Sequence, residues 1–366
     1  METRTSQLLG RLSESATIAM SRKARELKAA GRDIISLSLG EPDFDTPEPV
    51  KAAGIQAIED NFTHYPPVPG YPEVRQAICD KLKRDNGLDY AADQIVISTG
   101  AKHSLMNVVL SLVDAGDEVI LPAPYWVSYA DMTNLAGGKV VTVQTGIEQD
   151  FKMTADQLRN ALTDRTRIVM VNSPNNPSGS VYTEEEMAAL AAVLKEHPRA
   201  IAISDEIYEY INFTEAHASF AAQPGMMERT VTVNGVSKGF AMTGWRIGYI
   251  ISTNLEAMKQ VVKIQYYISA CSNDAMQYAV LEAMENANDY PSEMAAEFQK
   301  RCNLIVDRLN AMPGVQCHRP KGAIYVFPKV DVPGMSSEDV ALELLKDGVL
   351  CSPGSAFGPS GEGHLR

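Results

Sequence analysis

One lysine has neighbours that suit the chemistry of an imine. Lys238 lies between Ser237 and Gly239, shortly before Arg246, in a stretch rich in glycine, serine and threonine. Its amine can condense with an aldehyde, while hydroxyl groups and a guanidinium hold an anion beside it. Most lysines are simply solvated, so this interpretation depends on what the rest of the chain places near Lys238.

Three further segments carry groups that suit such a ligand. Gly100, Ala101 and Lys102 open a helix directly after a predicted strand, where the helix dipole and the first backbone N–H groups favour a phosphate. Trp126 follows another strand and can stack on a flat heterocycle, although an aromatic there is more often part of the core. Asn176 lies in a proline-rich turn that presents amide groups.

A carboxylate and a phenol follow a fourth predicted strand. Asp205 comes directly after the apolar run 200–203, so we expect it to be buried, and a buried carboxylate needs a cationic partner. A protonated ring nitrogen is such a partner, and Tyr208 can donate to a phenolate oxygen. The common cofactor with an aldehyde, a phosphate and a pyridine ring is pyridoxal 5'-phosphate. The sequence therefore predicts a site for it.

The elements that must position these residues form an α/β arrangement. Short β-branched runs alternate with amphipathic stretches such as 101–113 and 184–197, which indicates a mostly parallel seven-stranded sheet with helices on both faces. Ligands of such sheets bind beyond the carboxyl ends of the strands, where the candidate residues lie. The strands are predicted at 94–98, 117–121, 139–143, 167–171, 200–204, 230–233 and 247–251.

The ends of the chain have a different pattern. We expect a large domain over residues 47–280 and a smaller α+β domain over residues 281–366, to which an N-terminal arm, residues 1–46, also contributes. A long charged helix from Ser292, a strand at 315–317, an apolar segment at 322–327 and a helix at 337–347 predict the smaller domain.

Composition excludes several classes of partner. The formal net charge of −13 argues against binding to nucleic acid or an anionic membrane. The five cysteines form no CxxC pair and the six histidines show no metal-ligand spacing, so we expect no metal. Residues 1–11 lack the apolar core of a signal peptide, and no run approaches the roughly 18 apolar residues of a spanning helix. We expect a cytoplasmic protein.

Three longer motifs resemble those of class I aminotransferases, which are pyridoxal-phosphate enzymes of fold type I. They are residues 40–47, 172–179 and 237–249. The resemblance extends over essentially the whole chain and is strongest to the bacterial aspartate and aspartate/prephenate aminotransferases. It implies a homodimer that moves an amino group from aspartate, or another acidic amino acid, to a 2-oxo acid such as 2-oxoglutarate, with prephenate as a further candidate acceptor.

The resemblance also implies a role for each cofactor residue. Lys238 holds the aldehyde as an imine and then moves the α-proton as general base and acid, and Asp205 keeps the ring nitrogen protonated. Tyr208 and Asn176 bond the phenolate oxygen, and Trp126 stacks on the ring. The resemblance implies that Gly100, Ala101, Ser237 and Arg246 bind the cofactor phosphate and that Lys102 also contacts the cofactor. It implies that Tyr65 reaches the phosphate bound by the neighbouring subunit.

Substrate contacts follow from the same resemblance. Arg366 is expected to bind the α-carboxylate through its planar fork, with the Gly40 backbone N–H, Trp126 and Asn176 beside it. Residues that match a preference for acidic side chains are Lys102, Arg11, Ser15 and Thr17. Family members continue beyond the segment that carries this arginine, so we expect the chain to be truncated at Arg366.

Three alternatives remain open. A pyridoxal-phosphate lyase of the same fold differs only in which bond at the α-carbon breaks, and the sequence does not define that geometry. An aminotransferase that prefers neutral or aromatic amino acids is a second alternative. A non-catalytic regulatory module is a third, although no helix-turn-helix segment or basic patch precedes the fold.

Overall fold

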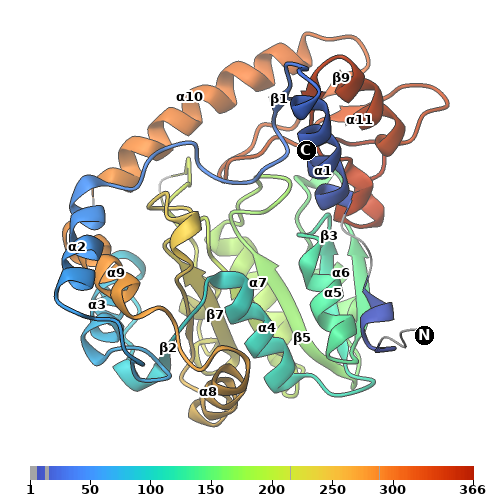
Figure 1. Cartoon of the computed structure of the whole chain (residues 1–366). Coiled ribbons are helices and arrows are strands. Elements are labelled where there is room, and N and C mark those ends of the chain that lie inside the picture. Colours follow the sequence, from blue (N-terminus) through green and yellow to red (C-terminus); the bar gives the residue numbers. More distant parts are fainter. Residues whose placement is uncertain (1–5, 13–15, 215, 288) are drawn as a thin grey trace, which may run out of the picture.

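The computed structural model describes residues 6–12, 16–214, 216–287 and 289–366. A seven-stranded sheet in the order β2-β8-β7-β6-β5-β3-β4 forms its centre (Figure 1). Only β8 runs antiparallel to its neighbours, so the mostly parallel sheet is confirmed. The strands are β2 (Ile95–Ser98), β3 (Glu118–Ala123), β4 (Lys139–Gln144), β5 (Thr166–Asn172), β6 (Ile201–Asp205), β7 (Thr230–Gly235) and β8 (Gly248–Ile251).

Helices cover both faces of this sheet, because successive side chains of a strand point to opposite sides. Ile120 and Val169 pack with α6 (Ala155–Ala161) and α7 (Glu184–Lys195). Their neighbours Val119 and Ile168 pack with α4, α5 and α8 on the other face. Those three helices are α4 (Ala101–Leu112), α5 (Ser128–Leu135) and α8 (Leu255–Ser269).

Helix α7 begins where the sequence predicts. Thr183 Oγ1 accepts from the Glu186 N–H at 3.3 Å, and Glu186 Oε2 accepts from the Thr183 N–H at 2.8 Å, which completes a capping box. Beyond the β2 edge of the sheet, three more helices enclose a separate apolar cluster around Ile78 and Tyr249. They are α2 (Glu48–Glu59), α3 (Pro72–Asn86) and α9 (Asp274–Asn286).

The two ends of the chain pack together. β1 (Ile35–Ser36) pairs in parallel with β11 (Val349–Leu350), and Met20 of α1 shares an apolar cluster with Leu345 of α11. In Figure 1 the long helix α10 leads from the α2–α9 region toward β9 and α11. The remaining elements are α1 (Ala16–Ala29), α10 (Tyr290–Asn310), β9 (Val315–Gln316), β10 (Lys329–Val330) and α11 (Ser337–Lys346).

The apolar segment 322–327 forms no strand beyond a single bridge between Gly322 and Asn212, because Ala323 adopts φ +58° and interrupts the extended backbone. The division at residues 46 and 280 stays a prediction. Within the described residues, no helix combines the length and the apolar character needed to cross a bilayer.

Candidate active site

Lys238 follows β7, and its amine points toward the segment before α2. Nζ donates to the carbonyl oxygen of Gly40 and lies 5.8 Å from the ring centre of Tyr208. Burial lowers the pKa of Lys238 to about 8, because an ammonium loses its hydration there. The charge of Glu41 opposes this shift, while Arg366 and Arg246 add to it. A large share of this amine is therefore neutral near pH 8.

Asp205 ends β6 and is buried, as the apolar run before it predicts. Its carboxylate accepts from the Tyr129 hydroxyl at 2.6 Å and from the Ile207 N–H at 3.2 Å. Burial raises the pKa of Asp205 to about 6, although these two hydrogen bonds oppose the shift. No lysine, arginine or histidine of the described part of the chain forms an ion pair with it. The carboxylate therefore suits a cation brought by a ligand.

At the N-terminus of α4, two glycines allow neighbouring groups to come closer than a side chain would permit. Gly100 has φ +85°, and a Cβ there would come within 2.2 Å of Arg246 Nη2. A Cβ on Gly248 would come within 2.4 Å of the Ala101 nitrogen. Arg246 itself is held by a 2.8 Å bond from Nη1 to the Thr243 carbonyl. A helix N-terminus beside a guanidinium suits a phosphate.

Hydroxyl and amide groups come from Tyr208, whose ring lies near Lys238 Nζ, and from Tyr325 and Asn176. The Tyr208 and Tyr325 hydroxyls are 2.6 Å apart, and burial raises the pKa of Tyr208 well above its usual value. The Asn176 N–H donates to Asn172 Oδ1 at 2.9 Å. Burial also raises the pKa of Tyr325, so both hydroxyls stay protonated; one donates to the other, and the second keeps its proton for a ligand.

Lys102 and Trp126 lie together as a cation–π pair. Lys102 Nζ is 4.8 Å from the Trp126 ring centre. Burial and the nearby Arg246 lower the pKa of Lys102. Trp126 also meets Tyr129 edge to face at 5.4 Å, which links this pair to Asp205.

Arg366 reaches the same site from the end of the described chain. Its Nη1 donates to Asn176 Oδ1 at 3.1 Å and its Nη2 to the Ser38 carbonyl at 2.6 Å. The guanidinium carbon lies 4.5 Å from the Tyr325 ring centre and 4.9 Å from that of Phe357. Its Nε is buried and has no partner among the described residues, so it remains a donor for an anion.

Of the predicted residues that the structure describes, Tyr65 is not brought to this site by the single chain. Tyr65 lies in the loop between α2 and α3 and is 90% exposed. Arg11 ends the short helix η1 (Leu9–Arg11), which contacts α5, and Thr17 lies in α1. The side chains of Arg11 and Thr17, and the whole of Ser15, fall outside what the structure describes.

Three contacts of the site escape the sequence analysis. Tyr129, which bonds Asp205, follows Trp126 by one turn, and that spacing is a signal that can find it. Tyr325 and Phe357 carry no such signal, because they come from the distant small part of the chain. Tyr325 also explains why residue 40 is a glycine, because a Cβ there would come within 2.2 Å of the Tyr325 hydroxyl oxygen.

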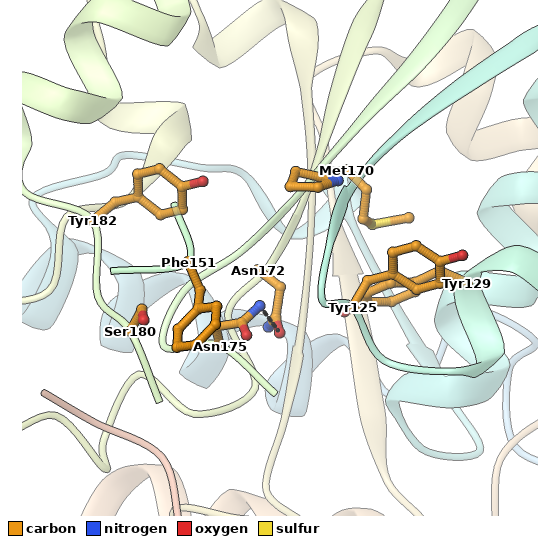
Figure 2. A pocket seen from close by; sticks show the side chains of 9 residues that line it. Tyr125, Tyr129, Phe151, Met170, Asn172, Asn175, Ser180 and Tyr182 are labelled. Atoms are coloured by element: carbon orange, nitrogen blue, oxygen red, sulfur yellow. Dashed lines mark hydrogen bonds between the residues drawn. The ribbon is translucent and has the colours of Figure 1, made fainter. Parts of the chain in front are cut away.

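A small cavity lies between the ends of β3 and β5 (Figure 2). Tyr129 and Asn172 line it, and the Asn172 amide donates to the Asp205 carbonyl at 2.9 Å. The remaining lining side chains include Tyr125, Phe151 and Tyr182. The turn around Asn172 thus supports both Asp205 and Asn176.

His217 belongs to a buried cluster of ionisable side chains, although the spacing of the histidines in the sequence does not indicate one. It is paired with the buried Glu206 at 3.0 Å, and Glu209 lies close enough for the three to hold a metal ion. Burial raises the pKa of Glu206, but His217, Ser204 and Ser219 together hold it below its usual value. The Glu209 carboxylate accepts from three other groups: Lys81, Asn86 and Asn234. These contacts make an ion-pair network without free carboxylate oxygens.

Comparison with known proteins agrees with this geometry. Residues 32–366 match the family described as aminotransferase class I and II. The chain belongs to this family. It is therefore an enzyme, a transaminase of fold type I.

Three aminotransferases illustrate the similarity. The aspartate/prephenate aminotransferase of Cereibacter sphaeroides is 46% identical over 327 residues, which are 89% of this chain and 82% of that protein. The aspartate aminotransferase of Thermus thermophilus, solved with maleate, is 39% identical with a TM-score of 0.94, over 100% of this chain and 94% of that one. The aromatic aminotransferase of Pyrococcus horikoshii is 41% identical with a TM-score of 0.88, over 95% and 92%.

Aminotransferases of this family generally use pyridoxal phosphate, and the side chains found here fit that group. The buried Asp205 lacks a cation that a pyridinium supplies. Gly100 lets the Arg246 guanidinium approach the N-terminus of α4, and Gly248 lets the Ala101 nitrogen approach β8, where a Cβ would collide with each. The Lys238 amine, whose pKa burial lowers, follows the same edge of the sheet and lies near the Tyr208 ring.

Proposed function

We propose that this transaminase binds pyridoxal 5'-phosphate and transfers the amino group of aspartate, or another acidic amino acid, to a 2-oxo acid such as 2-oxoglutarate. The observation that carries the proposal is the arrangement of Lys238, Asp205 and Arg366 around one site. The lowered pKa of Lys238 suits an amine that reacts with the cofactor aldehyde. The buried Asp205 has no cation beside it and suits the ring nitrogen. Arg366 keeps a free N–H donor for the carboxylate of the amino acid.

The chain's own residues have separate tasks in this reaction. Bound pyridoxal phosphate supplies a ring that accepts the electron pair left when the α-proton departs. The ionised Asp205 keeps the ring nitrogen protonated, since a buried carboxylate favours a cation beside it. Lys238 Nζ accepts the α-proton, and its pKa of about 8 suits a base at neutral pH. Tyr208 and Asn176 orient the ring through its phenolate oxygen.

The phosphate contacts follow from the N-terminus of α4. The N–H groups of Ala101 and Lys102 are among those that lack a partner within the helix, and Gly100 lets the Arg246 guanidinium approach them. Ser237 adds a hydroxyl beside Lys238. Trp126 stacks on the ring. These phosphate contacts support tight binding of the cofactor even before Lys238 reacts with its aldehyde.

Substrate recognition uses the remaining cations. We assign the α-carboxylate to Arg366, helped by the Gly40 N–H. Lys102, over the Trp126 ring, is placed to meet a second carboxylate, and Arg11, Ser15 and Thr17 complete the proposed acidic specificity, including for prephenate. A neutral-substrate enzyme would leave Lys102 without an anionic partner, which favours the acidic class.

A homodimer completes the proposed assembly, in which Tyr65 reaches the phosphate of the partner subunit. Its 90% exposure supports a role outside its own chain. Tyr266, Tyr267 and Ile268, at the end of α8, are also exposed, and large apolar groups gathered on a surface are typical of interfaces. The net charge of −13 and the five free cysteines support a cytoplasmic location without nucleic acid or membrane partners.

The deciding experiment follows the visible absorption of purified protein with pyridoxal phosphate, before and after addition of aspartate alone. We expect a cofactor band that aspartate shifts in a stoichiometric half-reaction, and 2-oxoglutarate should restore it. Release of ammonia without this shift would indicate the lyase of the same fold. Equal kcat/KM for aspartate, alanine and phenylalanine would reject the acidic specificity.

A further inference from the structure

Phe151 has a backbone conformation that a phenylalanine rarely adopts. It lies between η3 (Ile147–Gln149) and α6, with φ +54°, and Asp150 before it has the same φ. Two successive left-handed residues that are not glycine cost free energy, of order 1–3 kcal/mol each. Phe151 is nevertheless 4% exposed. The surrounding contacts must therefore offset this cost.

Polar side-chain and backbone contacts hold the loop in this conformation. Asp150 Oδ1 lies 3.1 Å from His318 Nδ1, and its Oδ2 lies 3.9 Å from Lys321 Nζ and from Lys152 Nζ. The Asp150 carbonyl accepts from the Ser180 hydroxyl. Asp150 thus ties the loop to segment 318–321 of the small part of the chain and to the turn that carries Asn176.

The Phe151 ring enters an aromatic cluster made of residues from that same part. It meets Phe327 edge to face at 5.6 Å and His364 at 5.5 Å. His364 stacks on Phe327 at 4.9 Å with an interplanar angle of 6°, and Phe327 meets Phe357 at 5.9 Å. On its other side Phe151 lines the small cavity beside Asn175 and Ser180 (Figure 2). The ring therefore lies between the turn at residues 175–180 and the aromatic side chains of segment 327–364.

This cluster ends at Arg366. His364 is two residues before it, and the Phe357 ring lies 4.9 Å from its guanidinium carbon. A change in the Phe151 ring shifts Phe327 and His364, because packed interiors transmit displacements. Asn176, which bonds Arg366, lies on the turn that Ser180 fastens to Asp150.

We propose that Phe151 is a positioning residue for Arg366, which it holds at the correct distance from Lys238 through Phe327, Phe357 and His364. The inference rests on the proposed role of Arg366 as the carboxylate ligand. It adds a specific consequence: the loop 146–153 controls substrate affinity without contacting the substrate.

The test compares Phe151→Leu with Phe220→Leu in the cofactor-loaded enzyme. Phe220 is also buried, at 1% exposed against 4% for Phe151, but it belongs to the core under α7. Both variants therefore remove a buried ring. We expect Phe151→Leu to raise KM for aspartate and for 2-oxoglutarate about tenfold with kcat reduced less, because a small misplacement of a binding group weakens substrate capture. Phe220→Leu should lower the melting temperature with KM unchanged.

Asp150→Asn serves as a second variant if Phe151→Leu does not fold. Asparagine tolerates the left-handed conformation, so this change removes the charge and keeps the backbone, and we expect KM to rise two- to threefold. Unchanged KM in the folded Phe151 variant, or equal KM changes in both phenylalanine variants, would overturn the inference. Failure of the wild-type enzyme to transaminate would instead overturn the proposed function.

Discussion

Burial acts on two ionisable side chains of this site in opposite directions. It lowers the pKa of the Lys238 ammonium to about 8 and raises that of the Asp205 carboxylic acid to about 6. Both shifts arise because water no longer stabilises the charged form. The fold alone therefore makes Lys238 easier to deprotonate and leaves Asp205 in a place where a cationic ligand would stabilise its charge.

Asp205→Asn should stabilise the cofactor-free protein at pH 7 while it reduces activity. A raised native pKa means that the folded state binds more protons than the unfolded state between pH 4 and 6, so stability falls as pH rises through that window. The shift from 3.8 to about 6 corresponds to about 3 kcal/mol. Urea unfolding at pH 7 and at pH 4 measures this gain. A gain of the same size at both pH values would contradict the explanation.

Lys238→Ala should lower kcat by at least about 10²-fold, the usual contribution of a general base. The variant should still bind pyridoxal phosphate, because the proposed phosphate contacts do not involve the lysine side chain. Borohydride should fix the cofactor to the wild-type chain and leave the variant unlabelled. Lys259→Ala, at an exposed position of α8, is the control and should retain activity. Activity close to wild type in Lys238→Ala would end the assignment.

At the scale of single elements, the start of α4 depends on one glycine. Gly100→Ala introduces a Cβ at φ +85° that would meet Arg246 Nη2 at 2.2 Å. We expect the dissociation constant of pyridoxal phosphate to rise about tenfold or more, because the guanidinium must move from the helix N-terminus. Fluorescence titration of the cofactor-free protein measures it.

Gly87→Ala is the matched control for this change. Gly87 ends α3 with φ +66°, and no atom lies within 4 Å of a Cβ built there. Its replacement carries the backbone cost alone, of order 1 kcal/mol, and should leave cofactor affinity unchanged. Equal affinities in the two variants would show that the approach of Arg246 is unimportant.

Much of this arrangement follows from local sequence. Each of the seven strands is a short β-branched run, and Thr183 with Glu186 defines the start of α7. Asp205 is buried because the run before it is apolar. By contrast, the contacts of Tyr325, Phe357 and Phe151 join segments far apart in the chain, and no local pattern predicts which rings meet. The positive φ of Ala323 likewise depends on tertiary packing.

At the scale of the whole molecule, the exposed Tyr65 makes a prediction about assembly. Light scattering of the purified protein should give a dimer, and Tyr65→Phe should weaken cofactor binding several-fold with the dimer intact, since only a hydroxyl donor to the partner's phosphate is lost. A monomer with full activity would contradict both the dimer and this role of Tyr65.

The reversal of β8 has a consequence for how this site can be rebuilt. Because Gly235 and Gly248 face each other across the β7–β8 pair, residues 236–247 form one closed loop that holds the reactive amine and the guanidinium together. The positions of Lys238 and Arg246 relative to each other are thus set by this one loop. Exchange of this loop as a cassette between related scaffolds should transplant both at once, whereas moving either residue alone would break their spacing.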